Sequence, residues 1–347
     1  MIGLLIAASV SMIVSLIGTR VLIEWLRSRH IGQPIHEDVQ GHSTKAGTPT
    51  MGGVAIVFSA LLGYVVAHIR EGVIFTNSGL LLMATIGGAG AVGLLDDWIK
   101  VKSERNLGLS KQAKLIGLLL VAVAFVVLAI NYTPVHTTLS WTRFDNFNID
   151  LGSVGWSVFA VFLILGSANA VNLTDGLDGL AAGAAIFAFS CFTVIAFWGF
   201  RHSLPAANFY SLAHAQDLAI CAAAMLGACV GFLWWNANPA RIFMGDTGSL
   251  AIGTGLAGLA LMTSTQLLLI IIGGLFIIET LSVVVQVASF RVFGRRVFRM
   301  APIHHHFELG GWPETTVFVR FWILAGLCAA LALGVYYADF LAIGGND

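Results

Sequence analysis

The chain has 347 residues, of which 57% are hydrophobic and only 10% are charged, whereas an average soluble domain has roughly 25% charged residues. Its 18 basic residues balance its 18 acidic residues, so no net positive field would draw it to nucleic acid. This composition excludes a disordered, collagen-like or disulfide-knotted chain. It predicts an all-α polytopic membrane protein that forms a single domain over residues 1–347.

Ten apolar segments are candidates for transmembrane helices, each of which needs about 20 mostly apolar residues. The first segment has no positive charge before its apolar run, which is typical of an uncleaved spanning helix and not of a signal peptide. One segment, Ser249–Met262, is short, so nine spans are the alternative. The expected spans are Ile2–Leu26, Met51–Ile69, Ser78–Leu95, Leu115–Asn131, Val154–Ala170, Leu180–Phe200, Leu218–Trp235, Ser249–Met262, Leu267–Phe290 and Val319–Ile343.

The basic residues are distributed unevenly over the nine loops between these spans. Fourteen of the 18 fall in the odd-numbered loops, and three (Arg70, Arg143 and Arg201) fall in the even-numbered loops. Cytoplasmic loops of membrane proteins carry the excess of Lys and Arg. We therefore expect the odd-numbered loops in the cytoplasm and both termini outside.

Five aspartates lie in apolar or Gly-rich stretches that this topology brings to one membrane face. They are Asp96 and Asp97 in GLLDDWIK, Asp175 and Asp178 in NLTDGLDG, and Asp246 in IFMGDTGS. Ionisable groups in membrane segments are costly and usually functional. The alternative for each one is an ordinary helix cap, but capping does not explain five on the same face.

The spacing of the polar residues around NLTDGLDG indicates how this segment is folded. Asn169, Asn172, Asp175 and Asp178 recur every three residues, which on a helix places them along one broad stripe. The glycines around Asp178 predict that the helix ends there. Broken backbone at membrane depth survives only where it lines a protein or water cavity, so we expect such a cavity here.

Adjacent Asp96 and Asp97 diverge by about 100° on a helix, so we expect them to do different jobs. One would hold a metal or accept a proton, while the other braces Lys100 or Lys114. A carboxylate cluster without a cysteine indicates a hard cation, and Mg²⁺ is the best candidate because it binds carboxylates together with phosphate oxygens and water. The lysines of this face, Lys45 among them, would bind phosphate; alternatively they only determine the topology.

The ninth loop, RVFGRRVFRMAPIHHHFELGGWPE, combines four arginines with three consecutive histidines. In an extended segment His304 and His306 would share a side and His305 would face the other way. Such imidazoles beside arginines can bind a pyrophosphate or transfer protons near neutral pH. A zinc site lacks a completing cysteine or spaced histidine, and a solvated polar loop is the remaining alternative. Glu279 and Gln286, in the preceding span, should face the interior of the bundle.

Several of these motifs occur in the order found in one family: KAGTPTMGG (residues 45–53), the Asp96–Asp97 pair, NLTDGLDG, FMGDTGS and APIHHHFE. Over nearly its whole length the chain resembles the phospho-N-acetylmuramoyl-pentapeptide transferases, a branch of the polyprenyl-phosphate hexosamine-1-phosphate transferases. The acidic motifs are shared by that superfamily, whereas the string from Pro302 to Glu308 favours the muramoyl-pentapeptide branch. The resemblance implies ten spans with both ends outside, and it suggests a homodimer.

The resemblance also implies a reaction. Undecaprenyl phosphate would attack the β-phosphorus of UDP-N-acetylmuramoyl-pentapeptide, giving lipid I and UMP, with Mg²⁺ required. The site would face the cytoplasm at the bacterial inner membrane, where a membrane lipid and a cytosolic nucleotide meet. A phosphate monoester already carries nucleophilic oxygens, so we expect a single displacement and not a covalent phospho-enzyme.

Individual roles follow from the matching motifs. Asp246 is expected to be the principal Mg²⁺ ligand, with Asp97 and then Asp96 beside it, and Asp97 would activate the prenyl phosphate. Together with His304, these three form the expected catalytic set. Phe243 would stack on uracil. The residues expected to bind the substrates are Lys45, Lys100, Lys114, Asn169, Asn172, Asp175, Gly176, Asp178, Asn236, Phe243, Gln286, His304 and His305.

Two other functions remain open from the sequence. A sister transferase would move N-acetylglucosamine-1-phosphate to a polyprenyl phosphate with the same metal and the same acids. A transporter with a carboxylate relay would instead place its acids near the bilayer midplane and show matching half-chain repeats.

Overall fold

The computed structural model describes residues 1–29, 47–102, 108–147, 149–202 and 214–343. These residues form twelve helices and one isolated β-bridge, between Thr138 and Asp150, and nine of the helices are long and apolar enough to cross a membrane. The prediction of an all-α polytopic membrane protein is therefore confirmed. The helices are α1 (Ile2–Ser28), α2 (Gly53–Glu71), α3 (Asn77–Lys102), α4 (Lys111–Tyr132), α5 (Gly152–Thr174), α6 (Leu180–Arg201), α7 (Ala215–Asn236), α8 (Gly245–Met262), α9 (Leu269–Ile272), α10 (Gly274–Phe293), α11 (Ile303–Glu308) and α12 (Glu314–Ala342).

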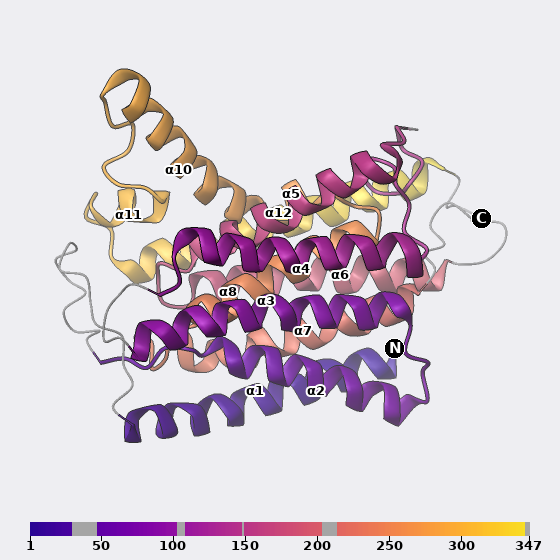
Figure 1. Ribbon diagram of the computed structural model, residues 1–347, viewed down its shortest axis with the longest axis horizontal. Coiled ribbons are helices and arrows are strands. Elements are labelled where there is room, and N and C mark those ends of the chain that lie inside the picture. Colours follow the sequence, from indigo (N-terminus) through magenta and orange to yellow (C-terminus); the bar gives the residue numbers. More distant parts are fainter. Residues whose placement is uncertain (30–46, 103–107, 148, 203–213, 344–347) are drawn as a thin grey trace.

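Most of the long helices run side by side across the molecule (Figure 1). The start of α1 and the end of α12 lie at the same end of the bundle, on the right in Figure 1. The end of α3 meets the start of α8 at the opposite end, where the hydrogen bonds described below join them. The first and the last helix thus begin and end, respectively, at the same end of the bundle. That this end lies outside the cell remains a prediction.

Helix α8 lies in the centre of the bundle, and every residue from Asp246 to Met262 is buried. It corresponds to the short eighth span predicted from the sequence, Ser249–Met262, but is not one of the nine candidate spans found in the described residues. A helix enclosed by protein does not have to face lipid, which explains its many small and polar residues. Gly53 of α2 packs on Gly248 so closely that a Cβ on Gly53 would overlap the Gly248 backbone.

The predicted span Leu267–Phe290 is wrong as a single helix. It divides into α9, which ends at Ile272, and α10, which begins at Gly274. A Cβ at Gly274 would lie 2.7 Å from Cys328 Sγ of α12, so the close packing at this break requires glycine. From the break, α10 leads away from the bundle towards the end that carries α11 (Figure 1).

Candidate functional site

Asp97, near the end of α3, holds the N-terminal turn of α8. Its Oδ1 accepts the N–H of Asp246 at 3.0 Å, and its Oδ2 accepts the N–H and the hydroxyl of Thr247 at 3.0 and 2.7 Å. The first N–H groups of a helix have no partner within that helix, so a carboxylate in this position acts as an N-terminal cap. Asp97 therefore fixes the place from which the Asp246 side chain projects.

The turn into α8 depends on glycine. Gly245 has a φ of +72°, a conformation that L side chains rarely adopt. A Cβ at this position would lie 2.5 Å from Asp97 Oδ2. Gly245 thus provides both the backbone turn and the space that lets Asp97 reach the start of α8.

Three buried carboxylates, Asp96, Asp97 and Asp246, form what we call the aspartate cluster. Each offers one oxygen, and these oxygens all lie within 4.8 Å of one another. Lys100 Nζ lies 2.5 Å from Asp96 Oδ2 and 2.6 Å from Asp246 Oδ2, and Lys114 Nζ lies 2.9 Å from Asp246 Oδ2. Three carboxylates against two ammonium groups leave an excess of negative charge, which suits a hard divalent cation.

Asp96 and Asp97 face different partners, as their adjacency on a helix predicts. Asp96 Oδ1 accepts the N–H of Leu109 at 2.8 Å, and its other oxygen pairs with Lys100. Asp96 therefore braces the lysine and the segment before α4, whereas Asp97 holds α8. Both still present an oxygen to the aspartate cluster.

Asn172 joins α5 to the aspartate cluster, but Asn169 does not. The Asn172 amide donates a close hydrogen bond to Asp246 Oδ1 and a second, of 2.8 Å, to the Ser249 hydroxyl. Asn169 is exposed, and its amide donates to the Leu165 carbonyl of its own helix. Three residues turn a helix by 300°, so the predicted stripe drifts by about 60° at each step and leaves Asn169 outside the cluster.

The helical structure is interrupted between α5 and α6, close to the glycines that predicted a helix end. Helix α5 ends at Thr174, and Gly179, with a φ of +78°, precedes α6. Asp175 lies in this turn, half-buried. Burial raises the pKa of Asp175 well above its usual range, and the nearby carboxylates of Asp246, Asp97 and Asp178 raise it further.

Asp178 and Asn236 connect this turn to the segment between α7 and α8. Asp178 Oδ2 accepts the N–H of Ala240 at 3.0 Å. Asn236 accepts the N–H of Gly179 at 3.1 Å and donates to the Ile242 carbonyl at 2.9 Å. Both side chains are buried, so their contacts hold the loop that leads to Asp246. Their expected binding of the nucleoside stays a prediction.

Phe243 sits in a backbone pairing that brings the start of α2 to this loop. Its N–H donates to the Pro49 carbonyl at 2.8 Å, and its carbonyl accepts the N–H of Gly52 at 2.9 Å. The Phe243 side chain is half-buried. Both backbone groups of Phe243, the N–H and the carbonyl, are thus hydrogen-bonded, while part of the ring surface remains accessible. Lys45, expected to bind the substrate from the same segment, lies outside the described residues.

The histidine motif forms a short helix, so the alternation of side chains that an extended segment would give does not occur. In α11 the histidines are spread around the axis: His304 is fully buried, and His305 Nδ1 lies 2.7 Å from Glu308 Oε2. His306 Nδ1 accepts the N–H of Arg299 at 3.1 Å. Pro302 precedes the helix, where its missing N–H costs no hydrogen bond.

Glu279 faces the interior, as expected of a polar residue in α10, whereas Gln286 is half-buried and bonds the loop that precedes α11. Glu279 is fully buried, and its Oε2 lies 3.1 Å from His304 Nδ1. Gln286 accepts the N–H groups of Val297 and Phe298 at 3.0 and 2.9 Å and donates to the Phe298 carbonyl at 2.9 Å. Gln286 therefore holds the loop before α11, and its expected substrate contact stays a prediction.

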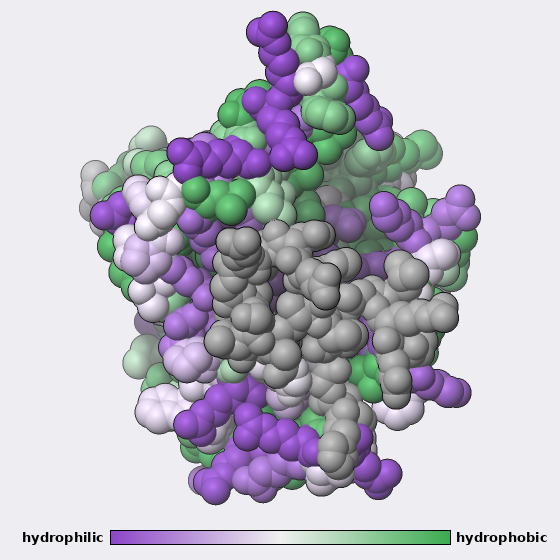
Figure 2. Space-filling view, turned by 90° about the vertical axis from the view of Figure 1, so that its left-hand side faces the viewer, coloured by the Kyte–Doolittle hydropathy of each residue, from purple (hydrophilic) through white to green (hydrophobic). Residues whose placement is uncertain are grey.

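Two participants were not singled out from the sequence. The Thr247 hydroxyl bonds Asp97, and the Ser249 hydroxyl accepts from Asn172. Thr247 directly follows Asp246 in GDTGS and Ser249 lies three positions after it, so Ser and Thr in the first helical turn are the available signal. Hydrophilic residues are spread over this end of the molecule, which Figure 2 views directly.

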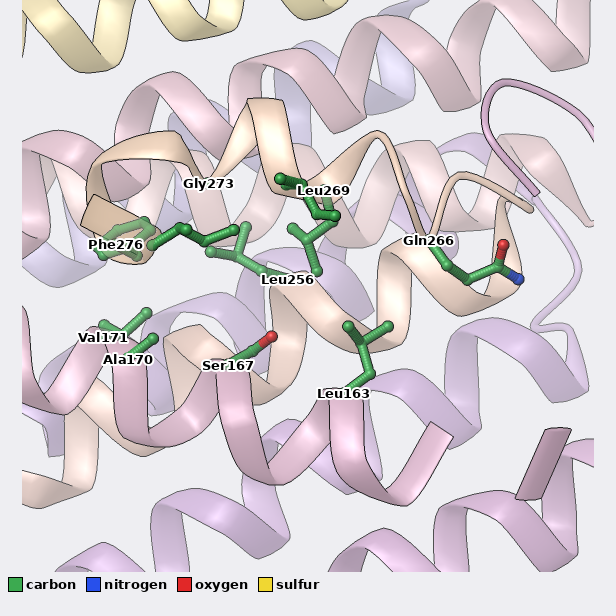
Figure 3. A pocket seen from close by; sticks show the side chains of 11 residues that line it. Leu163, Ser167, Ala170, Val171, Leu256, Gln266, Leu269, Gly273 and Phe276 are labelled. Atoms are coloured by element: carbon green, nitrogen blue, oxygen red, sulfur yellow. The ribbon is translucent and has the colours of Figure 1, made fainter. Parts of the chain in front are cut away.

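An apolar pocket lies between α5, α8 and the broken α9–α10 segment (Figure 3). Leu163 and Val171 of α5 line one wall, and Leu269 and Phe276 lie across from them. Gln266 is one of its few polar side chains. The pocket therefore offers an apolar surface at membrane depth.

Comparison with known proteins gives consistent matches. The profile of glycosyl transferase family 4 matches residues 78–264, and phospho-N-acetylmuramoyl-pentapeptide-transferase signature 1 matches residues 45–57. A phospho-N-acetylmuramoyl-pentapeptide-transferase of Frankia alni is 49% identical over 353 residues, which cover 99% of each chain. The enzymes of the same name from Saccharopolyspora erythraea and Streptomyces griseus are 50% and 47% identical, over at least 98% of each chain.

Proposed function

The chain belongs to the phospho-N-acetylmuramoyl-pentapeptide-transferase family, and on that premise we propose that it transfers phospho-N-acetylmuramoyl-pentapeptide from its UDP-linked donor to undecaprenyl phosphate, forming lipid I and UMP. It is a multi-pass bacterial membrane protein and a phosphoglycosyl transferase. The observation that carries the proposal is the aspartate cluster with Lys100 and Lys114 at the end of the bundle reached by the basic loops. We place that end in the cytoplasm, where the nucleotide donor is found.

Mg²⁺ is the proposed cofactor, held by Asp246 and Asp97 with Asp96 beside them. The donor set fits, since it consists of carboxylate oxygens within 4.8 Å of one another and contains no thiolate. When bound, Mg²⁺ would neutralise phosphate charge. The Asn172 amide then keeps the Asp246 carboxylate oriented.

Two phosphate-bearing substrates have to approach each other, and their repulsion is strong where water is excluded. Lys100 and Lys114 offer the positive charges that offset it, each already directed at Asp246. The prenyl phosphate carries its own nucleophilic oxygens, so the proposed reaction is a direct displacement at the β-phosphorus. Because the attacking oxygen needs little activation, Asp97, whose oxygens also cap α8, is required only as a weak proton acceptor or as a cation ligand.

The two substrates would reach the cluster from different sides. The apolar pocket between α5 and α10 suits part of a prenyl chain (Figure 3). The loop held by Asp178 and Asn236 presents Phe243, whose ring would stack on uracil. His304, His305 and Gln286 are proposed to bind the diphosphate and its sugar. A homodimer remains an expectation, to be checked by the mass of the detergent-solubilised particle.

The test is a transfer assay on the purified protein. Undecaprenyl phosphate is incubated with the UDP-muramoyl-pentapeptide or with UDP-N-acetylglucosamine, and UMP release and lipid product are measured with and without Mg²⁺. We expect product from the muramoyl donor only. Product from the N-acetylglucosamine donor alone would assign the sister reaction, and no product from either would remove the transferase assignment.

A further inference from the structure

Glu279 of α10 and His304 of α11 form a fully buried pair. Glu279 Oε2 lies 3.1 Å from His304 Nδ1, and both side chains are 0% exposed. Neither the carboxylate nor the ring has a hydrogen bond to any other group in the described parts of the chain. Burying a lone carboxylate in a membrane helix is costly, so the imidazole is its compensating partner.

The other nitrogen of His304 is directed at the turn between α5 and α6. A Cβ placed on Gly176 would lie 2.5 Å from His304 Nε2 and 2.9 Å from Cε1. Gly176 is exposed and follows Asp175, which is close enough to Asp246 and Asp97 of the aspartate cluster to interact with them electrostatically. Buried polar atoms normally have a hydrogen-bond partner, so an unpartnered ring nitrogen at the edge of such a site indicates that a group of the ligand is its partner.

The geometry explains how Glu279 controls this nitrogen. An ionised carboxylate only accepts hydrogen bonds, so the Nδ1 that faces it carries a hydrogen. That contact determines the ring orientation and leaves Nε2 on the side of Gly176, as carboxylates do for histidines in many active sites. His305 and His306 are held differently, by Glu308 and by the Arg299 backbone.

We propose that Glu279 is a positioning residue for the transfer reaction: through Nδ1 it holds His304 so that Nε2 meets a phosphate oxygen of the donor in the space beside Gly176. The inference rests on the proposed function. It adds a residue that lies inside a membrane helix and touches no substrate itself.

A double-mutant cycle tests this. The kcat and the donor KM are measured for the wild type, Glu279→Gln, His304→Ala and the double variant. Glu279→Gln keeps the volume but removes the charge, and we expect kcat to fall roughly 10–100-fold with KM changed less than about 3-fold. In the His304→Ala background the same change should cost nothing more. Ser282→Ala is the matched control, because among the described residues its hydroxyl hydrogen-bonds only the Glu279 backbone carbonyl in the same helix.

An equal loss of kcat in both backgrounds, or wild-type kcat in Glu279→Gln, overturns the inference. Should Glu279→Gln fail to fold, Gly176→Ala provides the second test, because its added methyl would lie 2.5 Å from Nε2 and so prevent a ligand from reaching this nitrogen in its present position. We expect a comparable fall in kcat, and a normal kcat would contradict the proposal. Inactive wild-type protein would instead refute the proposed function, so the two failures are distinguishable.

Discussion

Asp97 accepts the backbone N–H of Asp246 at 3.0 Å, so the two carboxylates expected to share a cation are joined through the first turn of α8. The residues are 149 positions apart in sequence. Their contact makes the position of the principal metal ligand depend on the end of α3. Asp97 thus has a structural role in holding α8 and a proposed chemical role as a cation ligand.

Asp97→Asn should lower both stability and activity. Asparagine has no charge, and one of its two positions is an N–H₂ group that would face the N–H donors of α8. We expect the free energy of unfolding to fall by roughly 1.5–3 kcal/mol, the usual contribution of hydrogen bonds to a charged group. Thermal unfolding in detergent measures this, and an unchanged midpoint would show that Asp97 does not hold α8.

Asp246→Asn should abolish turnover while the fold stays intact. The substitution keeps the side-chain volume, and the backbone bonds from Asp97 to α8 do not involve the Asp246 carboxylate. Removal of Mg²⁺ by a chelator should have the same effect on the wild type. UMP release and the thermal midpoint are the two readouts. Near-normal UMP release from the variant would refute the metal assignment.

Asn172→Ala should weaken metal binding without preventing it. The lost amide orients the Asp246 carboxylate, and partners of this kind typically change metal affinity 10–100-fold. We therefore expect the Mg²⁺ concentration for half-maximal rate to rise by about that factor. Asn131→Ala is the matched control, since within the described part of the chain the Asn131 amide donates only to the Val127 carbonyl of its own helix. Equal Mg²⁺ dependence in the two variants would contradict the role of Asn172.

Asp175→Asn should stabilise the metal-free protein near neutral pH. Burial and neighbouring carboxylates raise the pKa of Asp175, so ionising it opposes folding. In the unfolded chain this carboxyl ionises near pH 4, and stability is lost as the pH rises from there through the folded pKa. We expect the variant to melt roughly 2–4 °C higher at pH 7.

The difference should disappear below about pH 4, where the Asp175 carboxyl is protonated in both the folded and the unfolded state. Melting curves across this pH range, recorded with a chelator present, check both expectations. A wild type that melts above the variant at pH 7 would mean that the ionised carboxylate stabilises the fold.

Phe243→Ala should raise the donor KM more than it lowers kcat. Stacking on uracil is equally strong in the ground state and the transition state, so its loss weakens binding uniformly. The backbone contacts of Phe243 with Pro49 and Gly52 do not depend on the ring. Initial-rate kinetics over a range of donor concentrations separates the two parameters, and a pure loss of kcat would argue against stacking.

Nine of the ten predicted spans correspond to candidate membrane helices. This agreement is expected because the length and the hydropathy of a segment can be read from its own residues, without knowledge of the tertiary structure. One local expectation was wrong for a tertiary reason. The span Leu267–Phe290 breaks at Gly273, where α10 packs against Cys328 of α12. The HHH segment, whose side chains would alternate in an extended conformation, forms the helix α11, which packs on α10 and α12.

The sequence by itself determined the class of protein, the family and the group of aspartates, lysines and histidines from which a site can be built. Only the tertiary structure decided which of them meet. Asn172 reaches Asp246 while Asn169 does not, and Glu279 finds His304 from a different helix. Such pairings depend on the rotation and depth of each helix in the bundle, which are set by the packing of side chains distant in sequence and leave no periodic signal along the chain.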